Sequence, residues 1–351
     1  MEKLSSGKIK TMFIECCSKG ALSVAKGLLE IDPSIDNIED AFKRACQNGK
    51  LEVAKWLHEK YPNIDIHTDN EWAFRWACAD GHLETAKWLW QLDHKINVHV
   101  ENEEAFRFAC CYGRLETAKW LWQLDQKIDV HAYCEYAFRL ACANGHLETA
   151  KWLWQLDQKI DIHAINESAF INACSGGHLK VAKWLWQLDQ NIDIHAQNEG
   201  AFRWACRSGD FEMAKWLWQL DQKIDIHAQN EDAFVLPCSN GHLEVAKWLW
   251  QLDQKIDIHA QNENAFLKAC VYNHLETAQW LSTLCPNYIL KIEDGKIIRD
   301  CKITCSEIND NKKEIVELVE NGKYEEAINK IKEHKLDKKK KEASTIIELI
   351  Q

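Results

Sequence analysis

Histidine recurs along this chain at a fixed spacing, and histidine is both a common metal ligand and a general acid or base near neutral pH. A zinc ion needs its ligands at about 2.0–2.1 Å, whereas equivalent residues of stacked helices lie roughly 8–10 Å apart. One column of histidines therefore cannot share a metal between units, and the pattern favours a hydrogen bond in a connector or a surface position. The recurring residues, 32 positions apart, are His67, His99, His131, His163, His195, His227 and His259.

Cysteine follows the same period, and a thiol can act as a nucleophile, a metal ligand or half of a disulfide. Each periodic cysteine, however, has a helical context in which a free cysteine behaves as a small buried apolar residue. A disulfide needs Cα atoms within about 7 Å, which is less than the usual spacing of packed helices. We therefore expect reduced core thiols and an intracellular, cytoplasmic protein. The periodic cysteines are Cys46, Cys78, Cys110, Cys142, Cys174, Cys206, Cys238 and Cys270.

Motifs of catalysis are missing from the sequence. It contains no Gly-rich phosphate loop, no GxSxG and no HExxH, and the CxxxC of Cys301 and Cys305 has no second pair. The sequence therefore predicts a protein that is not an enzyme and has no cofactor site and no metal site. The formal net charge of −11 argues against general nucleic-acid binding, and no window approaches the roughly 18 apolar residues of a membrane span.

The repeat itself has a period of 32 residues. Ala-Lys-Trp-Leu begins at Ala54 and returns at that interval up to Ala246, with a changed copy at Ala278 and a weaker one at Ala25. Nine units therefore fill roughly residues 8–285. A fixed period of this size predicts a solenoid, a propeller or another array in which each unit packs on its neighbours.

The third unit, residues 70–99, shows which elements one repeat contains. Asn70 is a good N-cap, and apolar residues follow it at helical spacing until Gly81, a residue suited to a left-handed helix end. A second helix is expected over His82–Leu92, and it is apolar on two sides, as a helix inside a stack must be. Residues 95–99 alternate apolar and polar, which predicts a short extended connector.

Two helices, a glycine turn and a connector in 32 residues resemble the ankyrin repeat. The resemblance is carried by AxxGHLExAKWLxxL and by DIHA, and it covers about four-fifths of the chain. AFRxAC stands where the family has Thr-Pro-Leu-His, and this variant looks similar to ankyrin-repeat proteins that giant DNA viruses encode. The resemblance implies an all-α solenoid of about nine helix-turn-helix units, with the first helices on a concave side that binds another protein.

The domain organisation expected from the sequence is an array over residues 1–285 and an extension over residues 286–351. Asp294-Gly295 predicts a hairpin at the start of the extension. Two helices divided at Asn321-Gly322 should follow, with a last helix from Lys338 to Ile350.

Variation between units is concentrated at the positions equivalent to 72, 75, 76, 79 and 80, which form one stripe on the first helix. Trp, Tyr and Arg on this stripe are the residue types enriched in binding hot spots. A second explanation is that exposed positions drift, and Glu71–Arg75 and its counterparts are i,i+4 pairs that support a helix by themselves. The predicted protein-binding residues are Trp72, Arg75, Trp76, Arg107, Tyr112, Tyr136, Arg139, Arg203, Trp204 and Arg207.

Arg75, Arg107 and Arg139 recur at one offset, which predicts a basic column on an acidic protein. An extended acidic segment of a partner would complement it, because guanidinium groups bind carboxylates in a forked geometry. The sequence thus predicts a monomeric interaction scaffold. Two alternatives stay open: a substrate adaptor for a ubiquitin ligase, with residues 286–351 docking the ligase, and a structural component of a virus particle.

Pro237 stands where other units have alanine, inside the first helix of the eighth unit. Proline in a helix interior removes a hydrogen bond and costs about 3 kcal/mol. In an array held by nearest-neighbour contacts, this unit is predicted to be a hinge or an unfolding boundary.

Overall fold

The computed structural model describes residues 6–285, 287–290, 292–293, 295–297, 302–303 and 326. Within these residues the chain forms eighteen helices and four two-residue strands. The helices are α1 (Ser6–Lys19), α2 (Leu22–Ile31), α3 (Ile38–Gln47), α4 (Leu51–Lys60), α5 (Thr68–Ala79), α6 (Leu83–Leu92), α7 (Val100–Cys111), α8 (Leu115–Leu124), α9 (Ala132–Ala143), α10 (Leu147–Leu156), α11 (Ala164–Ser175), α12 (Leu179–Leu188), α13 (Ala196–Ser208), α14 (Phe211–Leu220), α15 (Ala228–Asn240), α16 (Leu243–Leu252), α17 (Ala260–Val271) and α18 (Leu275–Leu284).

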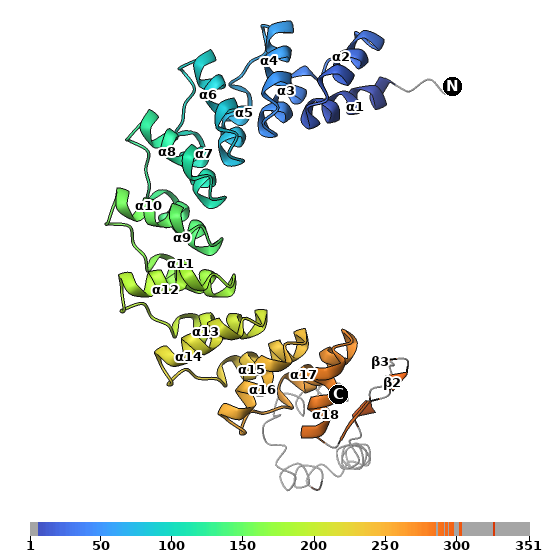
Figure 1. Ribbon diagram of the computed structural model, residues 1–351, viewed down its shortest axis with the longest axis vertical. Helices are drawn as coiled ribbons and strands as arrows, with labels where there is room; N and C mark the ends of the chain where they lie inside the picture. Colours follow the sequence, from blue (N-terminus) through green and yellow to red (C-terminus); the bar gives the residue numbers. More distant parts are fainter. Residues whose placement is uncertain are drawn as a thin grey trace. The chain divides into compact units, whose positions relative to one another are not determined.

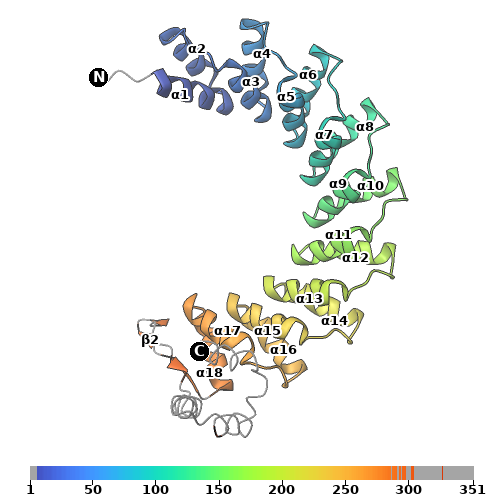
Figure 2. The ribbon, with the colours of Figure 1, turned by 180° about the vertical axis from the view of Figure 1, so that it is seen from behind.

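Each repeat contributes one odd-numbered and one even-numbered helix. From α1 to α13 the odd-numbered helices pack on one another, and each even-numbered helix packs on the odd-numbered helix of its own repeat. Figures 1 and 2 show two layers in this part of the chain, which we call the odd-helix layer and the even-helix layer. The predicted all-α solenoid of helix-turn-helix units is therefore confirmed.

The chain divides into two compact units, residues 1–237 with 244–260, and residues 238–243 with 261–351. The division passes through α15 directly after Pro237, which lies inside that helix. This is the residue at which the sequence predicts a weak point.

Glycine makes the turn between the two helices of a repeat. Gly81 has a φ of +83°, its N–H donates to the Cys78 carbonyl, and the His82 N–H donates to the Ala77 carbonyl. A Cβ on Gly81 would lie 2.6 Å from Cδ of Arg114, so a side chain here would also require Arg114 of the next repeat to move. The predicted left-handed helix end is confirmed.

Tryptophan and phenylalanine build the contact between repeats. Phe74 is 1% exposed, and its ring centroid lies 6.5 Å from that of Trp90 in its own repeat and 6.1 Å from that of Trp120 in the next. The even-numbered helix therefore presents one tryptophan inward and one toward the preceding repeat. This explains why that helix is apolar on two sides.

The periodic cysteines are buried in the same core, and every cysteine in the described residues is a free thiol. Burial raises the pKa of the Cys78 thiol well above its ordinary value. Such a thiol stays protonated and is a poor nucleophile. The predicted role as core residues is therefore confirmed, whereas Cys301 and Cys305 lie outside the described residues.

The start of each odd-numbered helix differs from the prediction. Asn70 is not an N-cap, because Asp69, Asn70 and Glu71 have φ values of 53°, 54° and 60° and form a three-residue left-handed turn before α5 continues. A left-handed conformation costs a non-glycine residue about 1–2 kcal/mol, so other contacts must hold it. The same turn occurs at 101–103, 133–135, 165–167, 197–199, 229–231 and 261–263.

The connectors between repeats contain no strand within residues 6–285. Between α6 and α7, two turns replace the expected extended segment. The alternation of side chains is nevertheless correct, since Ile96 and Val98 are buried and Asn97 between them is exposed.

Four short strands follow the last repeat: β1 (Tyr288–Ile289), β2 (Ile292–Glu293), β3 (Lys296–Ile297) and β4 (Lys302–Ile303). β2 pairs antiparallel with β3, as the Asp-Gly pair predicts, and β1 pairs antiparallel with β4. The Tyr288 ring stacks 4.1 Å from the Phe266 ring and takes the place of the next repeat's tryptophan. The helices predicted around Asn321-Gly322 and Lys338–Ile350 lie outside the described residues, so the boundary between residues 1–285 and 286–351 stays a prediction.

Candidate protein-binding surface

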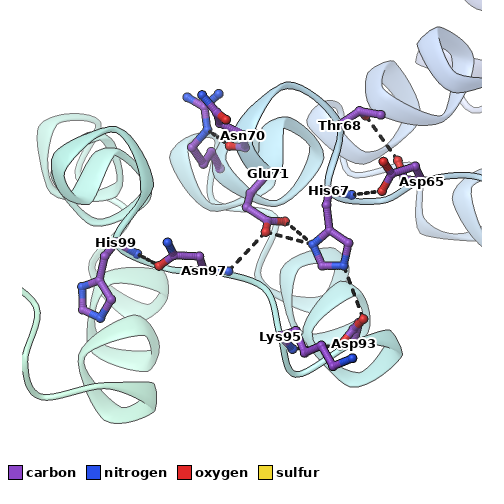
Figure 3. A network of polar contacts seen from close by, with 10 residues as sticks. Asp65, His67, Thr68, Asn70, Glu71, Asp93, Lys95, Asn97 and His99 are labelled. Carbon is purple, nitrogen blue, oxygen red and sulfur yellow. Dashed lines mark hydrogen bonds and ion pairs between the residues drawn. The ribbon is translucent and has the colours of Figure 1, made fainter.

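A hydrogen-bond network of histidine, glutamate and aspartate holds each left-handed turn in place (Figure 3). His67 Nδ1 lies 2.9 Å from Glu71 Oε1, and Nε2 of the same ring lies 3.3 Å from Asp93 Oδ2 at the end of α6. The Asn97 backbone N–H donates to Glu71 at 3.2 Å. One carboxylate thus joins the turn to the connector that leads to the next repeat.

The His–Glu–Asp network is repeated five more times within the first of the two compact units, residues 1–237 with 244–260. Its glutamates are only 6–7% exposed, and each of these buried carboxylates is hydrogen-bonded to the histidine of its network, although Oε2 of Glu167 has no partner. The periodic histidines are therefore connector hydrogen-bonding residues, as predicted. The other copies are His99–Glu103–Asp125, His131–Glu135–Asp157, His163–Glu167–Asp189, His195–Glu199–Asp221 and His227–Glu231–Asp253.

The two carboxylates change the pKa of the histidine ring that lies between them. The hydrogen bond to Glu71 is the main reason why the pKa of His67 is raised. Burial is the largest single effect on His131 and lowers its pKa, but Glu135 and Asp157 together outweigh it, so that this pKa is also raised. A protonated ring donates from both nitrogens and has no lone pair left for a metal. In the part of the chain that the structure describes, no cluster of His, Cys, Asp or Glu is arranged to hold a metal ion.

The arginines of the predicted basic column are buried, not free. Arg75, Arg107 and Arg139 are 8%, 7% and 8% exposed. Arg75 Nε donates to the Asn70 carbonyl at 2.6 Å and Nη2 donates to the Asp69 carbonyl at 2.9 Å. The expected pairing of Glu71 with Arg75 is wrong, because Glu71 bonds to His67 while Arg75 fastens the carbonyls of the left-handed turn.

The third side of each guanidinium contacts the next repeat. Arg75 pairs with Glu104, Arg107 lies over the Tyr136 ring with its Cζ 4.9 Å from the centroid, and Arg139 donates to Ser168 Oγ at 3.3 Å. Arg203 pairs with Asp232 at 2.7 Å. The position equivalent to residue 75 in one repeat therefore faces the position equivalent to residue 72 in the next repeat. Part of the variation at these two positions consists of matched pairs of residues.

Ile171 supports this interpretation. It replaces arginine at this offset, is 2% exposed, and faces Gly200 of the next repeat. A Cβ on Gly200 would lie 3.6 Å from Ile171, an ordinary van der Waals distance, so the apolar side chain here meets a small neighbour instead of a charged one. In these repeats the residue at this offset is matched to the residue that it contacts across the interface.

We expect a double-mutant cycle on Arg203 and Asp232, measured by urea denaturation, to give a coupling energy of about 1–3 kcal/mol. Both side chains are largely buried in the interface, and residues in contact couple by about this much. The same cycle on the exposed pair Glu116 and Lys119 should give about 0.5 kcal/mol or less. Equal coupling in the two cycles would show that the interface pairs are incidental.

The aromatic residues of the stripe form a continuous surface across α5, α7 and α9. Trp76 connects Trp72, at 5.9 Å between ring centroids, with Phe108, at 6.0 Å. Phe108 in turn lies 5.9 Å from Tyr112 and 6.2 Å from Tyr136. Tyr112 is 39% exposed and the other four are half-buried. We call these five residues the aromatic strip.

The remaining predicted residues, Arg203, Trp204 and Arg207, lie on α13, apart from the aromatic strip. Arg203 is committed to Asp232, and the Arg207 guanidinium lies 4.7 Å from the centroid of the Trp204 ring. At the offset of Trp76 the intervening helices carry Leu140 and Asn172, so the row of rings is interrupted.

Sequence reasoning missed two members of this surface. Phe108 connects the two halves of the aromatic strip, and Tyr133, which is 58% exposed, lies over Arg107 at 4.4 Å. Phe108 occupies the offset of Trp76, so a comparison of units could have found it. Tyr133 could not be found in this way, because its exposure depends on the left-handed turn.

Within the described residues, no helix has the length and apolar character needed to cross a membrane. No curated protein has a matching sequence. The crystal structure of the human ASB11 ankyrin repeat domain is similar to this chain at 19% identity and a TM-score of 0.43, over 64% of this chain and 95% of that chain. The family described as "Ankyrin repeats (3 copies)" matches residues 42–134, 138–230 and 202–289. These segments make up most of the sequence, and the chain belongs to the ankyrin repeat family.

Proposed function

We propose that this protein is a non-enzymatic interaction scaffold that binds a partner protein on the odd-helix layer, which is the concave side of the ankyrin fold. The contact is made by the aromatic strip of α5, α7 and α9. This strip is the observation that carries the proposal, because it gathers five rings in three adjacent repeats of a chain whose repeats are otherwise nearly identical.

The strip has the composition of a binding site. Large, partly exposed Trp and Tyr side chains supply much apolar contact area with few rotatable bonds, which is why they dominate binding hot spots. Trp76 and Phe108 are held in place by their ring neighbours, so little side-chain freedom is lost when a partner binds.

The acidic partner segment expected from the sequence required free guanidinium groups. Arg75, Arg107 and Arg139 use theirs for the left-handed turns and for the next repeat. The proposal therefore rests on aromatic contact instead of on a basic column. The ubiquitin-ligase adaptor and the virion component stay predictions, because residues 286–351, which would dock a ligase, are mostly outside the described residues.

The free thiols of the described cysteines support a reducing compartment, and we propose a monomer in the cytoplasm. The giant-virus resemblance expected from the repeat motifs stays a prediction, and so does a host protein as the partner.

A photo-crosslinker tests the proposed surface in the full chain. We expect Tyr112→p-benzoylphenylalanine to crosslink a discrete partner in a cell extract, because this side chain is exposed at the end of the strip. The matched control is Ser208→p-benzoylphenylalanine, at the same offset three repeats later and also exposed. The same crosslinked bands at both positions would contradict a specific site on the aromatic strip.

A further inference from the structure

The aromatic strip has an acidic edge. Several carboxylates beside it are already neutralised, since Asp69 pairs with Lys43 at 2.6 Å and Glu104 pairs with Arg75. Asp80 and Glu101 differ, because within the described part of the chain neither takes part in an ion pair. Asp80 follows the last turn of α5, and Glu101 belongs to the left-handed turn at the start of α7.

Asp80 lies beside the exposed end of the strip. The Asp80 backbone N–H donates to the Trp76 carbonyl at 3.0 Å, so Asp80 lies one helical turn after Trp76, and its carboxylate is one of the charged groups that act on Tyr112. A partner group that touches Tyr112 therefore also comes close to a carboxylate. Glu101 accepts a hydrogen bond from the neutral Asn70 amide at 2.7 Å, and its charge also acts on the Arg75 guanidinium.

Rings of the odd-helix layer already bind cations within the chain. The Arg44 guanidinium lies 5.7 Å from the centroid of Trp72, and the Arg107 guanidinium lies 4.9 Å from that of Tyr136. Among residues 6–285, no lysine or arginine lies over Trp76 or Tyr112. These two rings are thus electron-rich faces without a cation, next to a carboxylate.

We infer that the segment bound by the aromatic strip is basic and apolar, with an arginine that stacks on Trp76 or Tyr112 and pairs with Asp80. An aromatic face attracts a guanidinium through its quadrupole, and the adjacent carboxylate adds a charged hydrogen bond of the forked type. Apolar side chains on either side of that arginine would cover Trp72 and Phe108. The inference rests on the proposed function and specifies the chemistry of its partner.

A pair of labelled peptides tests this in the full chain, with binding followed by fluorescence anisotropy. One peptide alternates arginine with leucine, and the other has glutamate in place of each arginine. We expect the arginine peptide to bind at least tenfold more weakly to Trp76→Ala and several-fold more weakly to Asp80→Asn. Asp80→Asn keeps the shape of the side chain, so its effect reports charge and not folding.

Two matched controls separate this site from general attraction to an acidic protein. Trp204→Ala removes the same residue at the same offset outside the strip, and Glu116→Gln removes an exposed carboxylate from the even-helix layer. Neither should change binding by more than about twofold, which is about 0.4 kcal/mol.

Three outcomes would overturn the inference. If the glutamate peptide binds more tightly and loses binding with Trp76→Ala, the strip binds a partner of the opposite charge, and the proposed function survives. If neither Trp76→Ala nor Asp80→Asn weakens the arginine peptide while Tyr112 still crosslinks a partner, only the assigned chemistry is wrong. If Tyr112 crosslinks nothing specific as well, the proposed function fails together with the inference.

Discussion

The free energy of unfolding should fall as the pH rises above about 6.5, because six His–Glu–Asp networks lose their protons when the pH passes their raised pKa. The folded-state pKa of His67 and its five counterparts is raised. A raised pKa contributes stability that is fully present below the unfolded pKa of about 6.5 and is lost as the pH passes through the folded value. The rings are 35–39% exposed, and exposed ion pairs contribute about 0.2–1 kcal/mol each, so six amount to about 1–6 kcal/mol.

A second set of histidines makes the free energy of unfolding increase with pH, but in a lower pH range. Burial lowers the pKa of His82, His146 and His242 in the turns between helices. Their contribution increases with pH below about 6.5 and is constant above it. Stability should therefore be highest near this pH, and the measurement should stop at pH 8, below the ordinary pKa of the thiols.

Urea denaturation between pH 5.5 and 8 measures this dependence. His131→Gln removes one titrating ring and should reduce the slope above pH 6.5 by about a sixth, since equivalent sites contribute additively when they are far apart. His146→Gln should leave that part of the profile unchanged. A stability that is flat or increasing from pH 6.5 to 8 would show that the networks are not protonated in the folded protein.

Pro237→Ala should raise the free energy of unfolding by up to about 3 kcal/mol, because an alanine restores the backbone donor that proline lacks and removes the clash of its ring with the preceding turn. Pro237 is buried inside α15, directly at the division between the two compact units. In an array held by neighbour contacts, a weak repeat is where cooperativity breaks. We expect a broad or two-step denaturation curve of the natural chain to become steeper in the variant.

The reciprocal change is the matched control. Ala205→Pro places proline at the same offset in α13 and should lower stability by a similar amount. Hydrogen exchange gives the local measurement, and Pro237→Ala should slow the exchange of amides in α15. Equal protection of α15 in the natural chain and in Pro237→Ala would refute a weak point at this residue.

The architecture of the array could be predicted from the sequence because it depends on local periodicity. The 32-residue period, the glycine that ends each first helix and the apolar positions of Phe74 and Cys78 all follow from the spacing of side chains along one helix. The second apolar side of the even-numbered helices also indicated a neighbour, which the contact of Trp120 with Phe74 provides.

Only the tertiary structure decided which hydrogen bonds and ion pairs the polar side chains form. Asn70 has the propensity of an N-cap, but Glu71 is bonded by His67 and by the connector N–H of Asn97, and these bonds hold a left-handed turn that local propensity disfavours. The position of Arg75 in the helical pattern is that of a surface residue. The stacking of repeats nevertheless buries its guanidinium against Glu104, 29 positions later. The sequence determined which faces are apolar, since burial follows a period of 3.6 residues. Which polar groups form hydrogen bonds or ion pairs with one another depends on the register between stacked repeats. The pattern within one repeat does not determine this register.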